Sequence, residues 1–458
     1  MLIQNGTIVT PAGRRQAQIL IAGGKIAAII ASDQVVTENP GQVIDASGCF
    51  VFAGGIDPHV HMHLPTSAGY SSDDFYTGSR AALFGGTTTL IDFVTPARNQ
   101  PLTEALSHRK KEAEASLTDY SFHVSPVAWR DSLPDEIEAC VHAGVTSFKV
   151  YMAYKDSIGL DHHVLEKVMV HVGRAGGMVT IHCEMGDEID KLRNALFLKG
   201  KTEPSSHAVS RPPVTESRAV KAAIEMAGRT YCPLYIVHVS SLESLKHIRQ
   251  ARKQGQQVFA EVCPHHLLLD DAVYEAGFLQ AAPYVFSPPL RKEADREALW
   301  EALADGTIQV AGTDHCPFMM DQKMRGIDDF RLIANGAGGV EHRLELLYTY
   351  GVLERRISLE RMVEVTTANP ARIFGLYPSK GILEPGSDAD VVIWNPVAAR
   401  TISSASHHQN CDHNIYEGLG VKGQASMVIA GGNIVIRNGK MPHEPAGRFL
   451  SREPIVQP

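Results

Sequence analysis

The sequence predicts an α/β protein in which a TIM-like (β/α)8 barrel is joined to a small β-sandwich domain built from both termini. Three observations support this fold class. Apolar strand candidates alternate with helical stretches through the middle of the chain. Short β-prone pieces with glycine-rich turns occupy both ends instead. The chain of 458 residues is also long enough for one large catalytic domain and a smaller one.

The middle of the chain contains eight strand candidates, each a short run of apolar and β-branched residues. They are 50–61, 87–94, 120–124, 147–151, 179–183, 234–239, 258–262 and 309–314. Helical stretches, among them 216–228, 242–254 and 292–304, lie between them. Repeated strand–helix units imply parallel strands joined by right-handed crossovers, and eight units fit a catalytic barrel over residues 53–376. A doubly wound open sheet is the alternative, but no G-x-G-x-x-G follows the first strand.

Both ends of the chain consist of short β-prone pieces and turns, unlike the strand–helix alternation of the middle. Asn5-Gly6 is a turn between two β-prone pieces, and Gly23-Gly24 marks another. Similar β-rich stretches return at 389–394 and 426–436. We therefore expect residues 1–52 and 377–445 to form one small β-domain, followed by a C-terminal tail, 446–458. Two unrelated hairpin clusters are the alternative.

Composition and charge exclude several classes of protein. The formal net charge of −8 argues against a broad nucleic-acid surface. Seven scattered cysteines without CxxC pairs favour free thiols in a reducing compartment. No signal peptide is visible, and no apolar run approaches the roughly 20 residues of a membrane span. The expectation is a cytoplasmic protein that binds neither nucleic acid nor membrane.

Residues that commonly bind metals stand in or just after several strand candidates. They are His59, His61, Lys149, His182, His238 and Asp314. Side chains two apart on a strand face the same side, so the extended His59-Val60-His61 aims two imidazoles at one point. Active sites of such barrels lie at the C-terminal ends of the strands. Four histidines and an aspartate exceed what one open catalytic zinc needs, which favours two adjacent metal ions and a metallohydrolase.

Lys149 is the unusual member of this set, because an ammonium group would repel two dications. Burial can lower the pKa of a lysine and make the neutral amine reactive. A neutral amine could add carbon dioxide to form a carbamate, which would supply two oxygen ligands.

Three motifs resemble those of the cyclic amidohydrolases, most closely the dihydropyrimidinases and D-hydantoinases. They are GIDPHVH at 55–61, SFK at 147–149 and GTDHCPF at 312–318. Supporting stretches are FGGTTT at 84–89, SPPLR at 287–291 and PGSDAD at 385–390. The resemblance covers nearly the whole chain, and the combination is far more specific than any single motif.

The resemblance implies a role for each matched residue. One metal ion would be held by His59, His61, Asp314 and a carboxylated Lys149, and a second by Lys149, His182 and His238. The ions would be zinc. Asp314 would be the catalytic proton carrier, and Tyr154 would stabilise the oxyanion. Backbone groups at Ser287 and Asn335 would hold the cyclic amide or imide, and the family usually forms homotetramers.

The reaction implied is the opening of a 5-substituted hydantoin or a 5,6-dihydropyrimidine to an N-carbamoyl amino acid. Specificity for the side chain of the substrate would depend on loops after the early strands. There we expect contacts from Leu64, Tyr70, Phe93 and Ile158. Apolar contact discriminates weakly, by about 1–3 kcal/mol per methylene.

Each residue also has a structural alternative. His182 and His238 could be hydrogen-bonded core histidines, Asp314 a helix N-cap, and Tyr154 a packing residue. His315 follows Asp314 directly and should face away from it.

Other functions within and beyond the family are open. Allantoinase and dihydroorotase share a similar site, but dihydroorotases place an arginine where this chain has His63. Cys263-Pro264-His265-His266 departs from the Gln-Tyr that often follows Cys-Pro in dihydropyrimidinases and looks more like dihydroorotases; both histidines are expected to be structural or exposed. A non-catalytic scaffold like the collapsin response mediator proteins would have lost metal ligands, whereas every matched ligand is present here.

Overall fold

The computed structural model describes residues 1–36 and 41–454. Within them, parallel strands form a barrel sheet in the order β16-β15-β14-β13-β12-β11-β10-β7. In chain order these are β7 (Gly55–Val60), β10 (Thr87–Val94), β11 (Asp119–Val124), β12 (Ser147–Tyr151), β13 (Met178–His182), β14 (Leu234–Ile236), β15 (Val258–Val262) and β16 (Val310–Ala311). A parallel bridge between Val60 and His315 joins the first strand to the segment after the last. The predicted barrel is confirmed.

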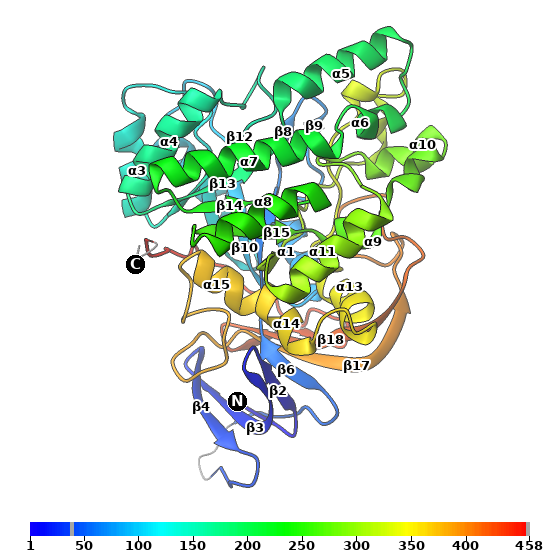
Figure 1. Ribbon diagram of the computed structural model, residues 1–458. Helices are drawn as coiled ribbons and strands as arrows, with labels where there is room; N and C mark the ends of the chain where they lie inside the picture. The colour runs from blue at the N-terminus through cyan, green and yellow to red at the C-terminus, as the bar shows by residue number, and fades with distance from the viewer. Residues whose placement is uncertain (37–40, 455–458) are drawn as a thin grey trace.

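Helices cover the outside of the barrel (Figure 1). The longer ones are α1 (Phe75–Phe84), α2 (Leu102–Glu112), α3 (Leu133–His142), α4 (His162–Arg174), α5 (Gly186–Leu198), α7 (Pro213–Thr230), α8 (Leu242–Lys253) and α11 (Glu293–Asp305). Shorter ones are α6 (Ser205–Val209), α9 (Pro264–Leu268), α10 (Phe278–Ala281), α12 (Met320–Met324), α13 (Arg343–Leu346), α14 (Leu359–Val363) and α15 (Asn369–Ile373). The three helical stretches expected from the sequence correspond to α7, α8 and α11. Local chemistry sets some boundaries: α1 begins with a capping box between Asp74 and Thr77.

Both termini contribute to a second sheet, which lies below the barrel in Figure 1. Its strands are β1 (Leu2–Gln4), β2 (Thr7–Thr10), β3 (Gly13–Ala22), β4 (Lys25–Ala31), β5 (Val43–Asp45), β6 (Phe50–Ala53), β17 (Val391–Thr401), β18 (Gly420–Ala430) and β19 (Asn433–Arg437). Its own apolar core joins Ile8 and Ile19 from the first part to Val391 and Ile429 from the last. The prediction of one small β-domain from both ends is confirmed. A short hairpin, β8 (Pro65–Thr66) and β9 (Gly69–Tyr70), stands apart.

The prediction of a single strand over 50–61 is wrong, because the run contains two strands of different sheets. β6 pairs with β2 and β17 in the terminal sheet, whereas β7 pairs with β10 in the barrel. The chain changes sheets at Gly54, where a Cβ atom would lie 2.1 Å from Oγ1 of Thr88. Both strands are largely buried, so their apolar residues form one uninterrupted pattern in the sequence.

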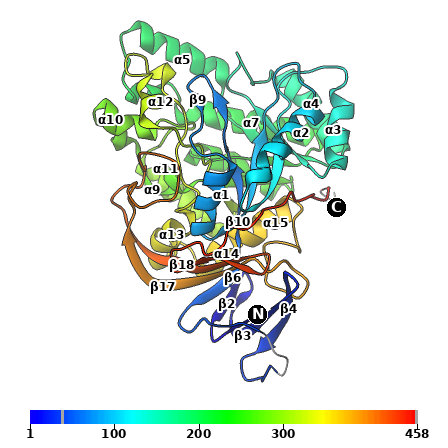
Figure 2. The same cartoon turned by 180° about the vertical axis from the view of Figure 1, so that it is seen from behind.

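The C-terminal segment packs against the barrel instead of leaving it, and Figure 2 shows it running along the back of the molecule. The amide of Tyr120 on β11 donates to the carbonyl of Arg448 at 2.9 Å. The guanidinium of Arg452 is buried and donates to Oγ of Ser147 at 2.8 Å, on the strand that carries Lys149. The tail therefore supports the base of the barrel.

All seven cysteines are unpaired, which agrees with the expected free thiols. Among the described residues, no helix is both long enough and apolar enough to cross a membrane.

Candidate metal centre

His59, His61 and Asp314 meet at the C-terminal end of the barrel. Nε2 of His59 lies 3.0 Å and Nε2 of His61 lies 3.1 Å from the same oxygen, Oδ1 of Asp314. β7 places the two imidazoles on one side, as the alternation of a strand requires. Asp314 follows β16 with a left-handed backbone, φ +51°. The ligand atoms of this trio are close enough together to hold one metal ion.

The second nitrogen of His59 is fixed by a buried carboxylate. Nδ1 lies 2.6 Å from Oε1 of Glu261, so Nε2 is left to face Asp314. Burial by itself would lower the pKa of His59, but the charges of Glu261 and Asp314 outweigh it and raise that pKa to about 9. Burial lowers the pKa of His61 to about 4. The two imidazoles of the motif are thus in electrically different environments.

His182 and His238 form a second pair beside this trio. Nδ1 of His182 lies 3.0 Å from Nε2 of His238, and the rings of His238 and His59 stack with centroids 5.4 Å apart. Nε2 of His182 contacts Oε2 of Glu184 at 2.7 Å, which again leaves one nitrogen to face the site. Burial lowers the pKa of both histidines, so both rings are neutral near pH 7.

Lys149 is 1% exposed in the middle of β12. Its Nζ lies 4.9 Å from the ring centre of Phe93 and 5.1 Å from that of Tyr151. In the part of the chain that the structure describes, nothing hydrogen-bonds to this amine. Burial lowers its pKa to about 8, although Asp314 and Glu261 oppose the shift. A substantial neutral fraction is therefore accessible at physiological pH.

The three expected substrate-binding residues lie together above the histidines. The ring of Tyr154 is 5.3 Å from that of His182. Oγ of Ser287 donates to Oδ1 of Asn335 at 2.9 Å. Burial raises the pKa of Tyr154, although the charge of Arg211 and a hydrogen bond with Ser287 oppose the rise. Tyr154 and His238, like Asp314, have a positive φ without being glycine. Such strained backbones are concentrated at functional sites.

Two carboxylates of this site, Glu184 and Glu261, escaped the sequence analysis. Both are fully buried, and Glu184 is also paired with the guanidinium of Arg211. The signals were present: Glu261 is a charged residue inside the apolar strand β15, and Glu184 follows His182 by two residues. A buried acid that faces an imidazole is the usual outer partner of a metal-binding histidine.

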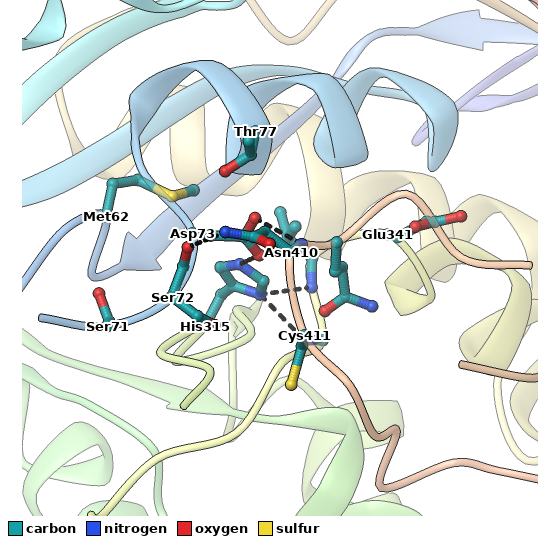
Figure 3. A network of polar contacts seen from close by, with 12 residues as sticks. Met62, Ser71, Ser72, Asp73, Thr77, His315, Glu341, Asn410 and Cys411 are labelled. Atoms are coloured by element: carbon teal, nitrogen blue, oxygen red, sulfur yellow. Dashed lines mark hydrogen bonds and ion pairs between the residues drawn. The ribbon is translucent and has the colours of Figure 1, made fainter. Parts of the chain in front are cut away.

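The side chain of His315 takes no part in the trio, as expected, and contacts Asp73, which anchors the segment that carries it (Figure 3). Its Nε2 donates to Oδ2 of Asp73 at 3.0 Å, while its Nδ1 accepts from the amide of Gly339. The other oxygen of Asp73 accepts from the amide of Asn410 at 2.8 Å. The segment after β16 is thereby held to the loop before α1.

A cleft of about 450 Å³ opens beside the barrel end. Leu64, Tyr70 and Phe93 line it, whereas Ile158 does not. The ring of His63 stacks on Tyr70 at 4.0 Å, and its Nδ1 contacts Glu112. Three of the four residues expected to sort substrates thus share one cleft.

The sequence model of the amidohydrolase family matches residues 50–435. The chain belongs to the amidohydrolase family. This amidohydrolase is 40% identical over 456 residues to the D-hydantoinase of Geobacillus stearothermophilus, with 98% of this chain and 96% of the relative covered. It is 38% identical over 458 residues to the dihydropyrimidinase of Arabidopsis thaliana, with 99% and 86% covered.

Solved structures agree with the sequence relatives. The crystal structure of the dihydropyrimidinase from Brevibacillus agri matches this amidohydrolase with a TM-score of 0.97 at 39% identity, covering 100% of this chain and 99% of that one. The expected membership of the cyclic amidohydrolases and the assignment as a hydrolytic enzyme are confirmed.

Proposed function

We propose that this amidohydrolase opens 5-substituted hydantoins or 5,6-dihydropyrimidines by metal-dependent hydrolysis, giving N-carbamoyl amino acids. The convergence of two imidazole nitrogens on one oxygen of Asp314 carries this proposal, together with a buried lysine that has no hydrogen bond among the described residues. The names of the relatives, D-hydantoinase and dihydropyrimidinase, support the substrate class.

The donor set fits a pair of divalent ions. One ion would be held by His59, His61, Lys149 and Asp314, and the other by Lys149, His182 and His238. Nε2 of His59, which faces Asp314 in the trio, is buried without a hydrogen bond among the described residues, and this fits a nitrogen that awaits a metal ion. Nitrogen and oxygen donors suit zinc, and amidohydrolases are generally binuclear metal enzymes. Bound here, the ions would polarise the substrate carbonyl and lower the pKa of a water molecule.

Lys149 would join both halves of the centre as a carbamate. Its neutral amine would form a bond to the carbon of carbon dioxide and lose a proton, which leaves an anion with two oxygen donors. The lowered pKa of this buried amine supports the proposal, because only the neutral form adds carbon dioxide.

Asp314 would carry the proton of the reaction. Although burial opposes it, the imidazoles of His59 and His61 hold the pKa of Asp314 well below its usual value. The carboxylate is therefore ionised and can accept a proton from the attacking water and pass it to the amide nitrogen that leaves.

Tyr154 would donate a hydrogen bond to the carbonyl oxygen as negative charge develops there. Its raised pKa keeps the phenol protonated at neutral pH. Removing one such donor typically costs about 10²–10³ in rate. Backbone groups of the adjoining Ser287 and Asn335 would hold the ring of the substrate in place.

A substrate panel tests the proposal. The protein, loaded with zinc and bicarbonate, is assayed with hydantoin, dihydrouracil, allantoin and dihydroorotate. We expect turnover of hydantoin or dihydrouracil and little of the others, since His63 stands where dihydroorotases place an arginine for the substrate carboxylate. Preference for allantoin or dihydroorotate would contradict the substrate class. A loaded protein that turns over none of the four would be a scaffold.

A homotetramer and a cytoplasmic location remain predictions from the resemblance and the composition. Sedimentation velocity tests the first: a single species of four chains is expected, and a monomer would contradict it. Fractionation of cells that produce the protein tests the second.

A further inference from the structure

A second cluster of metal-binding side chains lies directly after β15. Cys263, His265 and His266 are 0%, 4% and 2% exposed. One ligand atom from each lies within 4.8 Å of those of the other two. The cluster has no residue in common with the trio of His59, His61 and Asp314, and no proposed ligand of the binuclear centre belongs to it. It occupies the position where the sequence departs from the Cys-Pro-Gln-Tyr of many dihydropyrimidinases.

The local backbone brings the three side chains together. The amide of His266 donates to the carbonyl of Cys263 at 3.0 Å, which closes a turn and places these two side chains three residues apart on one side of it. The rings of His265 and His266 are 4.3 Å apart and inclined at 62°. One ring nitrogen of each imidazole lies within 4.8 Å of the sulfur.

Three polar atoms of this cluster lack hydrogen-bond partners among the described residues. Nε2 of His266 must donate to the carbonyl of Pro288, 3.0 Å away, because a carbonyl only accepts; Nδ1 is then a bare lone pair. Nδ1 of His266 and Nε2 of His265 are both buried without a hydrogen bond. Within the described residues, Sγ of Cys263 makes none either. Buried polar atoms are normally paired, so three unpaired ones side by side indicate a ligand.

The charges around the cluster favour a cation. Burial raises the pKa of the Cys263 thiol, and the charges of Glu261, Asp314 and Asp57 raise it further, while Lys149 opposes them. The three carboxylates would attract a metal ion. Burial lowers the pKa of His265 and His266, so both imidazoles are neutral and able to coordinate. One thiolate and two imidazoles form a donor set for zinc or cobalt, with one position open.

We propose that Cys263, His265 and His266 form a third metal site for a divalent ion such as zinc, separate from the binuclear centre. On binding, the thiol of Cys263 loses its proton to solvent and a sulfur–metal bond forms, without transfer of electrons. The ion ties the end of β15, which carries Glu261, to the segment of Ser287, because His266 is already bonded to Pro288. The site thus stabilises two parts of the catalytic region.

Cobalt substitution tests this site by its spectrum. The metal-free protein is reloaded with Co²⁺, and the near-ultraviolet region is searched for a thiolate-to-cobalt charge-transfer band. The binuclear centre cannot produce the band, since none of its proposed ligands is a cysteine. We expect the band in the wild-type protein and in Lys149→Ala. If the cobalt-loaded wild-type protein lacks the charge-transfer band, the proposal is overturned. This result is obtained without any variant.

Two variants and a matched control locate the ion. Cys263→Ser is expected to lose the band and to bind one ion per chain fewer than wild type by elemental analysis. Cys140→Ser, which changes another buried cysteine on α3, is expected to keep both. His265→Gln retains the thiol and should bind the third ion at least tenfold more weakly. This variant provides the test if Cys263→Ser does not fold. Unchanged metal content and band in the folded Cys263→Ser or His265→Gln protein would overturn the proposal, as would loss of the band in Lys149→Ala.

Discussion

The histidine side chains of the candidate metal centre are oriented by buried carboxylates that contact their outer ring nitrogens. The imidazole of His59 is held at Nδ1 by Glu261, and that of His182 is held at Nε2 by Glu184. Each contact decides which nitrogen is left to face the centre. The tyrosine hydroxyl of Tyr235 in turn donates to Glu261 at 2.8 Å, which orients the carboxylate itself. The carboxylates therefore orient the histidines, and Tyr235 in turn orients Glu261.

Glu261→Gln is predicted to weaken metal binding without unfolding the protein. The amide keeps the size of the carboxylate but loses the charge that favours a donating Nδ1 on His59. Loss of such an outer partner typically costs about 10- to 100-fold in metal affinity. Competition with a chelator measures the affinity, and Glu301→Gln, on the exposed face of α11, is the control. Equal affinities in the two variants would show that Glu261 does not orient His59.

At the scale of elements, the regular parts were predictable and the irregular ones were not. The pattern of continuous apolar runs identified the barrel strands because these strands are buried on both faces. It could not separate β6 from β7, since burial is continuous through the change of sheet at Gly54. Nor could it place Arg452 under the barrel, because a contact so distant in sequence leaves no local pattern. The metal-binding residue types were visible, whereas the pairing of Glu184 with His182 and of Glu261 with His59 depends on three-dimensional contacts.

Lys323 on α12 joins the two segments that carry Ser287 and Asn335. Its buried Nζ, whose pKa burial lowers to about 7, donates to the carbonyls of Val285, Ala334 and Gly336, at 3.2, 3.0 and 2.9 Å. We predict that Lys323→Met raises KM much more than it lowers kcat, because the three carbonyls lose their common donor and the segments separate. Steady-state kinetics measure both constants, with Lys199→Met, an exposed lysine, as the control. A normal KM in Lys323→Met would contradict this role.

At the scale of the whole molecule, a buried charge cluster joins the terminal sheet to the barrel. Nζ of Lys380 lies 2.6 Å from Asp119 of β11, 2.9 Å from Asp388 and 2.6 Å from Asp390. Although burial opposes it, the lysine holds the pKa of Asp388 below its usual value, and the three carboxylates raise the pKa of Lys380. The two parts of the fold are thus coupled through ionised groups.

This cluster predicts a stability that depends on pH. Because the folded pKa of Asp388 is depressed, its contribution is complete above the unfolded value of about 3.9 and is lost as the pH falls below it. The raised pKa of Lys380 gives a contribution that is lost only at strongly alkaline pH. Lys380→Met should cost about 3–5 kcal/mol at pH 7, since it leaves carboxylates buried without their cation. Denaturant unfolding at pH 7 and pH 3 measures both effects; an unchanged stability at pH 7 would contradict the coupling.

Lys149→Ala tests the central claim most directly, because this side chain would bind both ions of the centre. Metal content by elemental analysis and turnover of hydantoin and dihydrouracil are measured on the wild-type protein, Lys149→Ala and the control Lys167→Ala, an exposed lysine of α4. The account predicts that Lys149→Ala loses turnover and binds about one to two fewer ions per chain than wild type, while the control is unchanged. A folded Lys149→Ala protein with wild-type metal content and full activity would contradict the binuclear mechanism.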